Sequence, residues 1–385
     1  MAYINRNLES SLKKYLKVFP AVGLTGPRQS GKSTMLKTIL ASSYEYVTFD
    51  DYEMVRSFQD DPKGFFNKYS DRVVFDEVQK VPDLFHYIKL QIDNDRRRYG
   101  KYILTGSSQF VFMKSITESL AGRIGLLTLL PFQRNEIPVS SQDRSTYYWC
   151  YPEQVVNKFK ENISWYSAYI ETYLSRDVRD LSNIGQLREF RRCLFLLATR
   201  TSQILDLSTL AHDLGVAVNT VKKWISVLEA SYIIFLLPPF YNNLGKRIVK
   251  SPKVYFFDTG LVSFLTGIKD EDTFIKSPIY GAIYENYIVA EIYKNIIHSR
   301  SDNELFYYRT SNGVEVDLII DQKTSKEFLE IKASKKYQPD MVESIIKIKK
   351  KYEKGILIYR GKDFNPEQNL FCKNASQYLR FSKDE

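Results

Sequence analysis

The sequence is poor in the residues that build disulfides and metal centres. It holds 3 Cys and 3 His among 385 residues, and none of them stands at the spacing of a zinc ligand set: Cys150, Cys193, Cys372, His86, His212 and His298. A disulfide framework normally uses an even set of cysteines in a short secreted chain. The sequence therefore argues against a disulfide scaffold and against a zinc site.

Long hydrophobic runs and disorder-promoting residues are also scarce. The most apolar stretch, 232–237, is far shorter than the ~18 residues that a membrane-spanning helix needs, and residues 1–10 lack the apolar core of a signal peptide. Only 17 Gly and 13 Pro accompany 44% hydrophobic and 26% charged residues, a composition typical of folded globular proteins. We expect a soluble, cytoplasmic protein without a membrane partner.

The chain has a formal net charge of +10 at pH 7, but no segment of it is a polycation. The excess of Lys and Arg is spread thinly along the sequence and nearly vanishes beyond residue 265. Such a distribution fits a solubilising surface of mixed sign, and it also fits a DNA-facing patch that forms only on folding. Charge alone leaves both interpretations open.

The pattern of apolar residues changes twice along the chain and divides it into three predicted regions. In residues 1–150 short apolar strands alternate with helical stretches, which is typical of an α/β domain with parallel strands. In residues 151–265 apolar residues recur at helical spacing, so this region is predicted to be mainly helical. In residues 266–385 a long amphipathic helix, about 279–297, precedes β-type runs, which indicates a second α/β unit. The runs span 304–308, 314–320 and 327–331.

The most informative motif is the run Gly26-Pro27-Arg28-Gln29-Ser30-Gly31-Lys32-Ser33. It fits the phosphate-binding pattern G-x-x-x-x-G-K-[ST] and lies between an apolar strand, 21–24, and a helical stretch, 34–40. Its glycines allow backbone N–H groups to surround phosphates, Lys32 reaches the β and γ phosphates, and Ser33 ligates Mg²⁺. We predict that Gly26 to Thr34 binds ATP, with Mg²⁺ as the cofactor.

Two further strand ends carry polar residues that suit ATP hydrolysis. The strand 73–75 runs into Asp76 and Glu77, at the carboxyl edge of the sheet, where α/β folds bind ligands. We expect Asp76 to hold Mg²⁺ through water and Glu77 to orient or polarise the attacking water, with a solvated acidic turn as the alternative. The strand 102–105 leads to Ser107, which is placed either to contact the γ-phosphate or to cap the next helix.

The run Leu120-Ala121-Gly122-Arg123 offers a candidate arginine finger. An arginine spreads positive charge over a transferring phosphoryl group. Arg123 therefore joins Lys32, Glu77 and Ser107 as a candidate catalytic residue, and a surface salt bridge is its competing interpretation.

These motifs resemble those of a large prokaryotic family of AAA-type ATPases whose members carry a C-terminal domain of unknown function. The resemblance continues beyond them and covers nearly the whole chain, through the runs 173–178, 246–255, 257–261 and 315–317. It implies a AAA-type ATPase domain, a winged-helix-like segment and a fold similar to restriction endonucleases. One departure is Ser202, which stands where the resemblance implies Gly.

The middle region supports part of this picture independently. The run 207–215 is typical of a capped helix that ends in Gly, and 219–228 of a second helix, at the spacing of a helix-turn-helix unit. The second helix is expected to expose residue types that contact phosphates or base edges: Asn219, Thr220, Lys222 and Lys223. Because helix-turn-helix units also serve as packing modules, DNA contact remains one of two interpretations.

The C-terminal region holds a second set of residues that can carry chemistry. Glu285 on the long helix, Asp317 and the run from Glu330 to Lys332 follow the acid, D, E-x-K order of restriction-type nucleases. Asp317 and Glu330 on adjacent strands would share a Mg²⁺ ion, and Lys332 would orient water or stabilise the phosphorane. Because E-x-K is common in Lys-rich chains and this region is nearly neutral, a retained scaffold is the alternative.

We therefore expect an α/β protein with a AAA-type P-loop ATPase domain (1–150), a helical winged-helix-like domain (151–265) and a restriction-endonuclease-like α/β domain (266–385). The expected function is Mg²⁺-dependent ATP hydrolysis that repositions the two downstream domains on DNA or on a protein partner. One alternative is a nucleotide-gated DNA-binding or scaffold protein with negligible turnover, and another is an ATP-regulated, metal-dependent nuclease. A homo-oligomer is also compatible with the sequence, which specifies neither a substrate nor a pathway.

Overall fold

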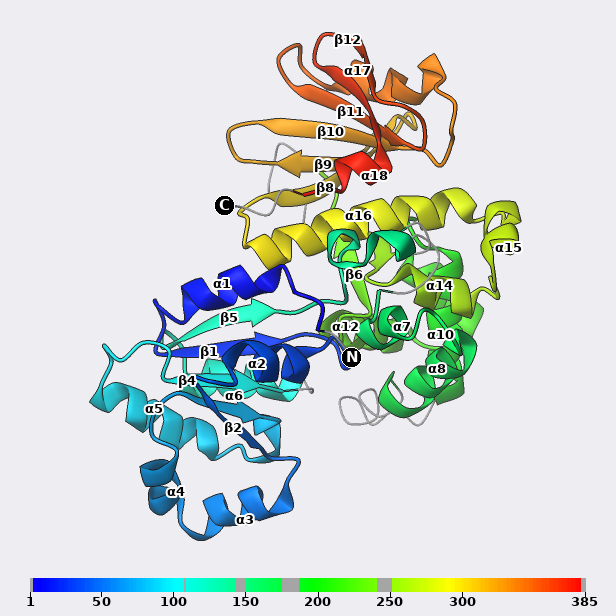
Figure 1. Ribbon diagram of the computed structural model, residues 1–385. Helices are drawn as coiled ribbons and strands as arrows, with labels where there is room; N and C mark the ends of the chain where they lie inside the picture. The colour runs from blue at the N-terminus through cyan, green and yellow to red at the C-terminus, as the bar shows by residue number, and fades with distance from the viewer. Residues whose placement is uncertain (1–2, 107–108, 143–149, 175–186, 241–250, 382–385) are drawn as a thin grey trace. The chain divides into compact units, whose positions relative to one another are not determined.

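The computed structural model describes residues 3–106, 109–142, 150–174, 187–240 and 251–381. The chain divides into two compact units (Figure 1): unit 1 comprises 1–132 with 230–232, and unit 2 comprises 133–229 with 233–385. The division into three domains stays a prediction. None of the described helices combines the length and the apolar composition that crossing a bilayer requires.

Unit 1 is built on a five-stranded parallel sheet in the order β2-β3-β4-β1-β5. Its strands are β1 (Ala21–Thr25), β2 (Glu45–Thr48), β3 (Val73–Asp76), β4 (Tyr102–Thr105) and β5 (Ile124–Thr128). The apolar runs predicted the first four of them. Its helices are α1 (Leu8–Tyr15), α2 (Lys32–Leu40), α3 (Tyr52–Asp60), α4 (Pro62–Lys68), the short η1 (Val78–Lys80), α5 (Leu84–Asn94) and α6 (Gln109–Ser119).

Two apolar cores lie on the two faces of this sheet. Side chains alternate along a strand, so Val22 and Leu24 of β1 join one core while Ala21 joins the other. The first core includes apolar residues of α1 and α2, and the second is rich in aromatic rings from α3, α4 and α5. Because helices cover both faces, β1, β3 and β4 are buried over their whole length. This burial fixes the carboxyl ends of the central strands, which carry the site.

The first part of unit 2 is mainly helical and includes a two-stranded sheet. The elements are η2 (Arg134–Glu136), η3 (Val139–Ser141), α7 (Pro152–Val156), α8 (Asn162–Ala168), η5 (Tyr169–Leu174), α10 (Leu187–Thr199), α11 (Leu207–Leu214), α12 (Val218–Ala230), β6 (Ile234–Leu237) and β7 (Lys253–Phe256), with β6 and β7 antiparallel. Asp206 caps α11 by accepting from two backbone N–H groups, and Gly215 ends it at φ +68°. The capped helix predicted for 207–215 is therefore confirmed. Ser202 has φ +63°, a left-handed conformation that favours the Gly implied by the resemblance.

The C-terminal part of unit 2 contains a six-stranded mixed sheet in the order β12-β13-β11-β10-β9-β8. Its elements are α14 (Thr259–Leu265), α15 (Glu271–Lys276), α16 (Tyr280–Ser299), β8 (Glu304–Arg309), β9 (Glu315–Asp321), β10 (Lys326–Ile331), η6 (Pro339–Val342), α17 (Glu343–Ile348), β11 (Lys354–Tyr359), β12 (Phe364–Glu367), β13 (Leu370–Asn374) and α18 (Ala375–Tyr378). The pairs β8–β9 and β9–β10 are antiparallel, whereas β10–β11 and β11–β13 are parallel. The predicted long helix and three strand runs are confirmed, with ends within two residues.

Candidate functional site

The P-loop connects the end of β1 to the start of α2, and two glycines allow its tight curve. Gly26 has φ +136° and Gly31 has φ +92°, backbone conformations that L side chains rarely adopt. A Cβ at Gly26 would lie 2.1 Å from the carbonyl oxygen of Leu129, so only glycine fits there. Because α2 begins directly after Gly31, the N–H groups of its first turn and the positive end of its dipole favour an anion at the loop.

Two buried cations hold the P-loop through its carbonyl oxygens. The Lys32 ammonium donates to two of them, on the first two residues of the loop, each at 2.9 Å. The Arg6 guanidinium donates to the carbonyl oxygens of Ser30 and Leu130, each at 2.7 Å. Arg6 thereby ties the loop to the segment after β5. No motif signals this contribution, because Arg6 lies well outside the P-loop in sequence.

Asp76 accepts hydrogen bonds from hydroxyl groups of three elements at the carboxyl edge of the sheet. Its Oδ2 accepts from Ser33 Oγ at 3.0 Å and from the Tyr46 hydroxyl, and its Oδ1 accepts from the Thr105 hydroxyl. Because β4 lies between β1 and β3, the end of β4 reaches Asp76 directly. Burial, with the nearby Asp76 carboxylate, raises the pKa of Tyr46 well above its ordinary value, so the phenol remains a donor. No sequence motif assigns a role to Tyr46 or Thr105.

Glu77 follows Asp76 in a left-handed backbone conformation with φ +57°. A non-glycine residue in this region is uncommon, and its strain must be offset by neighbouring contacts. The side-chain amide of Gln79 donates to Glu77 Oε2 and supplies one such contact. Glu77 therefore lies beside Asp76 at the edge that the P-loop also borders. Gln79 was not singled out from the sequence.

The donor set at this edge fits Mg²⁺. Ser33 and Asp76 offer hard oxygen atoms, and Mg²⁺ typically binds one or two protein oxygens together with substrate phosphates and several waters. Among the described residues, no group of three or more His, Cys, Asp and Glu side chains is arranged to hold a metal ion. Ser33 and Asp76 supply only one hydroxyl and one carboxylate, so they do not form a group of this kind, and substrate phosphates and waters would complete the Mg²⁺ coordination.

Two of the predicted catalytic residues are not seen at this edge. Arg123 directly precedes β5, and its carbonyl oxygen accepts from Ala21 N at 3.4 Å, which places it at the start of β1. The P-loop follows the other end of β1, so the topology excludes contact between Arg123 and a nucleotide bound to the same chain. The Arg123 guanidinium instead makes two contacts of 2.8 Å with the Asp93 carboxylate. Ser107 lies outside the described residues.

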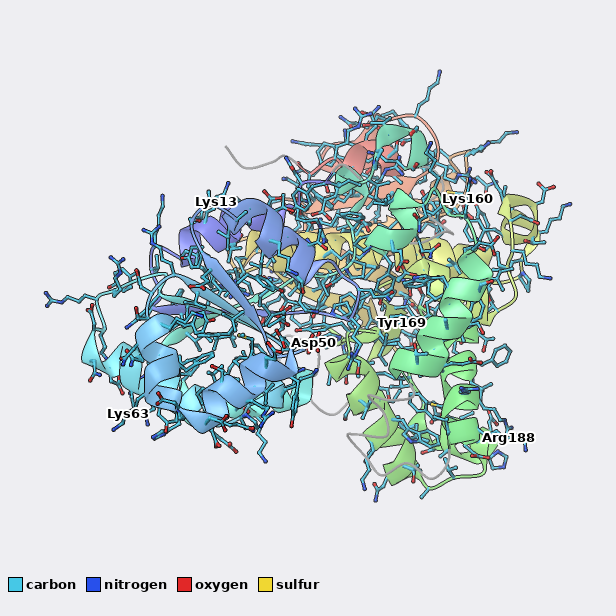
Figure 2. The ribbon with its side chains drawn as sticks, turned by 60° about the horizontal axis from the view of Figure 1, so that its bottom comes forward. Lys13, Asp50, Lys63, Lys160, Tyr169 and Arg188 are labelled. Carbon is cyan, nitrogen blue, oxygen red and sulfur yellow. The ribbon has the colours of Figure 1, made fainter. Side chains whose placement is uncertain are left out.

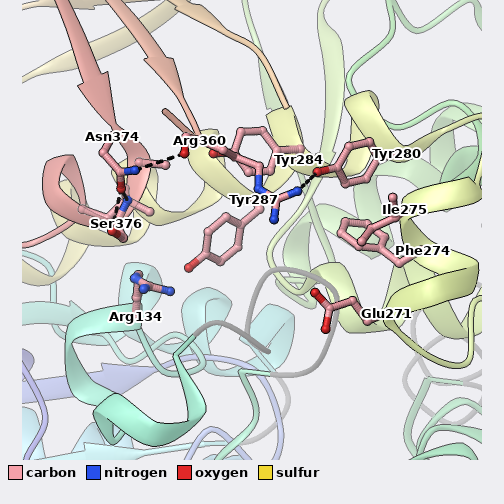
Figure 3. A pocket seen from close by; sticks show the side chains of 12 residues that line it. Arg134, Glu271, Phe274, Ile275, Tyr280, Tyr284, Tyr287, Arg360, Asn374 and Ser376 are labelled. Carbon is pink, nitrogen blue, oxygen red and sulfur yellow. Dashed lines mark hydrogen bonds between the residues drawn. The ribbon is translucent and has the colours of Figure 1, made fainter. Parts of the chain in front are cut away.

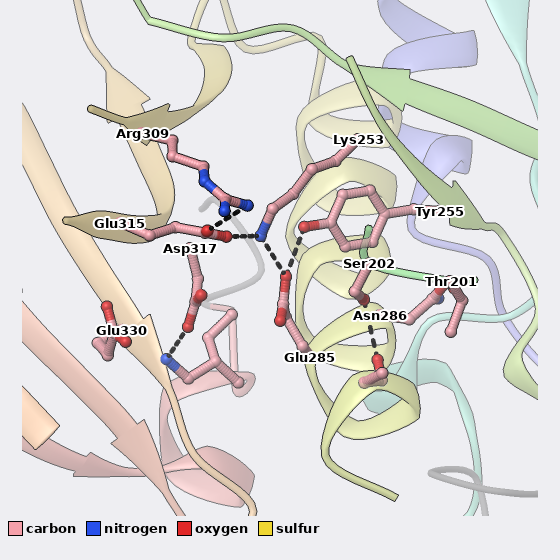
Figure 4. A network of polar contacts seen from close by, with 12 residues as sticks. Thr201, Ser202, Lys253, Tyr255, Glu285, Asn286, Arg309, Glu315, Asp317 and Glu330 are labelled. Carbon is pink, nitrogen blue, oxygen red and sulfur yellow. Dashed lines mark hydrogen bonds and ion pairs between the residues drawn. The ribbon is translucent and has the colours of Figure 1, made fainter. Parts of the chain in front are cut away.

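The predicted nuclease residues come together in unit 2, in a group that we term the acid–lysine cluster (Figure 4). Its members are Glu285, Glu315, Asp317, Glu330, Lys253 and Lys332. The antiparallel register of β9 and β10 sets Asp317 beside the end of β10, where its Oδ2 accepts from Ile331 N at 2.8 Å. Lys332 Nζ lies 2.6 Å from Glu330 Oε1 and 3.8 Å from Asp317 Oδ2.

Lys253 enters the acid–lysine cluster from β7. Its Nζ lies 2.6 Å from Glu315 Oε1 and 3.1 Å from Glu285 Oε1, and its side chain is only 3% exposed. The Tyr255 hydroxyl donates to the same oxygen of Glu285 at 2.6 Å. Lys253 and Tyr255 stand two residues apart on one strand and so share a face. Their spacing indicates that the two side chains share a face of a strand, but nothing in the sequence indicates that β7 lies beside these acids.

Burial makes the acid–lysine cluster electrostatically costly. It raises the pKa of Glu285 to about 7 and that of Glu330 to about 8, and the Asp317 charge adds to both shifts. Glu330 Oε2 is buried and has no hydrogen-bond partner in the described part of the chain. Perturbed carboxyl groups of this kind occur at functional sites and also in structural ion networks.

The predicted DNA-contact residues lie on α12. Asn219, Lys222 and Lys223 are exposed and Thr220 is half-buried. The opposite side of the helix is buried through Val221, Trp224, Ile225, Val227 and Leu228. This arrangement suits a DNA-binding face and a solvated face equally, so the predicted contact stays a prediction.

Three family models match consecutive parts of the chain. The model of an AAA domain matches residues 18–138, and two domains of unknown function match residues 142–272 (DUF8612) and 280–378 (DUF4143). Among solved structures, a Walker-type ATPase of Pyrococcus abyssi is similar at 16% identity over 68% of this chain and 96% of that chain, with a TM-score of 0.48. A Holliday junction branch migration motor of Thermotoga maritima is similar at 16% identity over 61% of this chain and 90% of that chain, with a TM-score of 0.31.

Sequence relatives extend the likeness beyond the AAA region. Uncharacterized proteins of Mycobacterium bovis and Mycobacterium tuberculosis are each 30% identical over 318 residues, which is 82% of this chain and 71% of theirs. An uncharacterized protein of Methanocaldococcus jannaschii is 24% identical over 206 residues, 52% of this chain and 41% of that protein. Because the mycobacterial match spans most of both chains and the AAA match contains the P-loop and Asp76, the chain belongs to their family of AAA-domain P-loop ATPases.

Proposed function

We propose that this protein binds ATP with Mg²⁺ at the P-loop and hydrolyses it. The observation that carries the proposal is the convergence of Ser33, Tyr46 and Thr105 on Asp76, at the edge of the sheet where the P-loop meets α2. A carboxylate held by three hydroxyl groups beside a helix N-terminus suits a Mg²⁺–phosphate complex. Lys32 completes the arrangement, because its ammonium exchanges loop carbonyl oxygens for phosphate oxygens.

In this proposal each residue at the edge acts on a different part of the reaction. Ser33 and Asp76 hold Mg²⁺, which neutralises charge on the phosphates. Glu77 accepts a hydrogen bond from the attacking water and orients it toward the γ-phosphate. Gln79 is a positioning residue, because its amide donates to Glu77 and fixes that carboxylate.

The test separates ATP binding from ATP turnover. Lys32→Ala is expected to lose binding of a fluorescent ATP analogue, because its ammonium contacts phosphate in the ground state. Glu77→Gln is expected to bind the analogue normally and to lose phosphate release by roughly 10²–10⁴-fold, the usual contribution of a general base. Lys13→Ala is the matched control, since Lys13 is an exposed lysine of α1 (Figure 2). Wild-type turnover in Glu77→Gln would contradict its assigned role.

We further propose that ATP hydrolysis repositions a winged-helix-like segment and a nuclease-like sheet on DNA or on a protein partner. The order α10, α11, α12, β6, β7 supports a winged helix, and so does the antiparallel bridge from Ile204 to Lys253, which adds a third short extended segment. Phosphate release measured with and without duplex DNA tests the coupling. Equal turnover under both conditions, with DNA shown to be bound, would argue against it.

A metal-dependent nuclease is a second candidate function, favoured by the buried and unpartnered oxygen of Glu330. The alternative is a scaffold, which the Lys253 contacts favour, because Lys253 and Lys332 already place two ammonium groups among the acids. The two candidates differ in whether a divalent cation acts on Asp317 and Glu330.

The nuclease test is cleavage of linear, circular and single-stranded substrates with ATP and either Mg²⁺ or Mn²⁺. A working nuclease would cleave at least one substrate, and Asp317→Ala or Lys332→Ala would abolish cleavage while ATP turnover survives. If the wild-type protein leaves every substrate intact, the scaffold function stands. Lys326→Ala is the matched control, because Lys326 lies on β10 with its nearest ion-pair contact, to Asp321, at 3.9 Å.

A further inference from the structure

Unit 2 contains a cavity of about 290 Å³ that has no role in the proposals above (Figure 3). Its wall is formed by α15, three tyrosines of α16, η2 and the segments that follow β11 and β13. Its polar and aromatic lining includes Arg134, Glu271, Tyr280, Tyr284, Tyr287 and Arg360. All of them belong to unit 2, whereas the P-loop belongs to unit 1, so the cavity and the P-loop share no residue.

Two guanidinium groups give the cavity an anion-binding character. Arg134 is 7% exposed, and its Nη1 donates to Gln142 O at 2.6 Å, which fixes the side chain. Arg360 Nη1 donates to the Tyr280 hydroxyl. The Asn374 amide donates to the Arg360 and Gly361 carbonyl oxygens at 3.3 and 2.8 Å, and so holds the Arg360 backbone. Both guanidinium groups are therefore placed by the fold and present planar arrays of donors that suit phosphate.

A buried hydroxyl is aimed at the same space. Tyr284 is 4% exposed, and its hydroxyl has no hydrogen-bond partner among the described residues. An unpaired buried hydroxyl costs folding free energy, so its retention points to a partner from outside the chain. Arg134 and Arg360 line the same cavity as Tyr284, so the three groups face one space that an anion can occupy.

The remaining wall suits the other half of a nucleotide. Tyr280 and Tyr287 present aromatic rings, and Phe274 packs edge-on against Tyr280 with ring centroids 4.9 Å apart. Glu271, in the first turn of α15, contributes a carboxylate, which would repel an isolated anion but accepts hydrogen bonds from sugar hydroxyl groups. The volume of about 290 Å³ lies at the lower end of small-ligand pockets and limits the ligand to about one nucleotide.

We propose that this cavity binds a nucleoside monophosphate, with the phosphate on Arg134, Arg360 and Tyr284, the ring against the tyrosines and a sugar hydroxyl on Glu271. The proposal does not rest on the ATPase proposal, because the two sites share no residue. It assigns a second nucleotide site of smaller size and different chemistry to the chain.

The experiment is calorimetric titration of AMP, ribose 5-phosphate, inorganic phosphate and adenosine into the full chain carrying Lys32→Ala, which removes the P-loop contribution. AMP is expected to bind most tightly, ribose 5-phosphate more weakly, and adenosine weakest. Tyr284→Phe and Arg360→Gln should each weaken AMP binding by about tenfold or more, since each removes a hydrogen bond to a charged group. Lys362→Gln, an exposed neighbour, is the control and should bind AMP normally.

Tyr284→Phe keeps this proposal testable, because loss of an unpaired hydroxyl does not threaten folding. Unchanged AMP affinity in a folded Tyr284→Phe protein would overturn the assignment of Tyr284 to the phosphate. The absence of heat from all four compounds at millimolar concentration would overturn the site. Equal affinity for AMP and ribose 5-phosphate would overturn the proposal that the tyrosines bind the base of a nucleotide, and it would identify a sugar phosphate as the ligand.

Discussion

Replacing Lys253 with methionine should destabilise unit 2 strongly at neutral pH. Methionine has nearly the length of the lysine stem but no charge, so the change removes contacts of 2.6 Å to Glu315 and 3.1 Å to Glu285 with little change in packing. Breaking a buried ion pair by removing one partner costs about 3–5 kcal/mol, because the other charge is left uncompensated. Glu315 keeps Arg309 at 3.3 Å, so most of the loss falls on Glu285.

The loss should depend on pH, with a sign set by Glu285. Burial raises its pKa in the folded protein to about 7, above the unfolded value of 4.5, so the folded state binds the proton more tightly. A carboxyl group shifted in this direction stabilises the fold at low pH and loses that contribution as the pH rises through 4.5 toward 7. In Lys253→Met its pKa rises further. At pH 8 Lys253→Met should lower the free energy of unfolding by the full ~3–5 kcal/mol of a broken buried ion pair. At pH 5 Glu285 is neutral, so the loss falls to the ~1–2 kcal/mol of a lost hydrogen bond.

Urea unfolding at pH 5 and pH 8, followed by tryptophan fluorescence, measures this effect. All 3 Trp residues lie between 133 and 229, so their emission reports on unit 2. Lys326→Met is the control, because its partner Asp321 is 3.9 Å away, so the change removes a much longer ion-pair contact than those of Lys253. Adding Glu285→Gln to Lys253→Met should restore much of the loss at pH 8. A loss below ~1 kcal/mol at pH 8, or an equal loss at both pH values, would refute the reasoning.

Other predictions concern single contacts. Tyr46→Phe removes a donor to Asp76 and should weaken Mg²⁺-dependent ATP binding by roughly tenfold while ATP binding in EDTA is unchanged; an equal loss in both titrations would contradict the metal role. Arg123→Ala should leave the ATP turnover of dilute protein unchanged, since Arg123 pairs with Asp93 at the far edge of the sheet, and a large loss would point to a neighbouring copy. Charge reversal of Lys222 and Lys223 should weaken DNA binding and lower its salt slope by about 2, whereas the exposed pair Lys13 and Lys14 serves as control.

The local motifs at the carboxyl edge of the sheet were visible in the sequence, whereas the contacts between them were not. The P-loop and the Asp76 strand end are local patterns, and local spacing is what a sequence displays directly. Tyr46 and Thr105 meet Asp76 only because the strand order places β2 and β4 on either side of β3. Strand order is a long-range property, so the sequence offered no sign that these hydroxyl groups converge.

The buried apolar runs of β1, β3 and β4 were predicted as strands, whereas β7 and β11, which are also almost wholly buried, were not. β5, one of the two edge strands of its sheet, was missed, and its residues alternate between buried and half-buried, so it lacks the continuous burial of β1, β3 and β4. In the acid–lysine cluster, the order of Glu285, Asp317, Glu330 and Lys332 was visible in the sequence. The contact of Lys253 with these acids was not visible in the sequence, because it depends on how β7, from another part of the chain, packs beside them.

The discontinuity of unit 1 has a consequence for the order in which the protein is completed during synthesis. Residues 230–232 belong to unit 1 although the chain before and after them belongs to unit 2. The Tyr232 hydroxyl lies 2.9 Å from Thr25 Oγ1 and 3.2 Å from Thr128 Oγ1, and Thr25 directly precedes the P-loop. The contacts of Tyr232 with Thr25 and Thr128 therefore cannot form when residue 132 leaves the ribosome, and they must wait for about a hundred further residues, most of which form the helical half of unit 2.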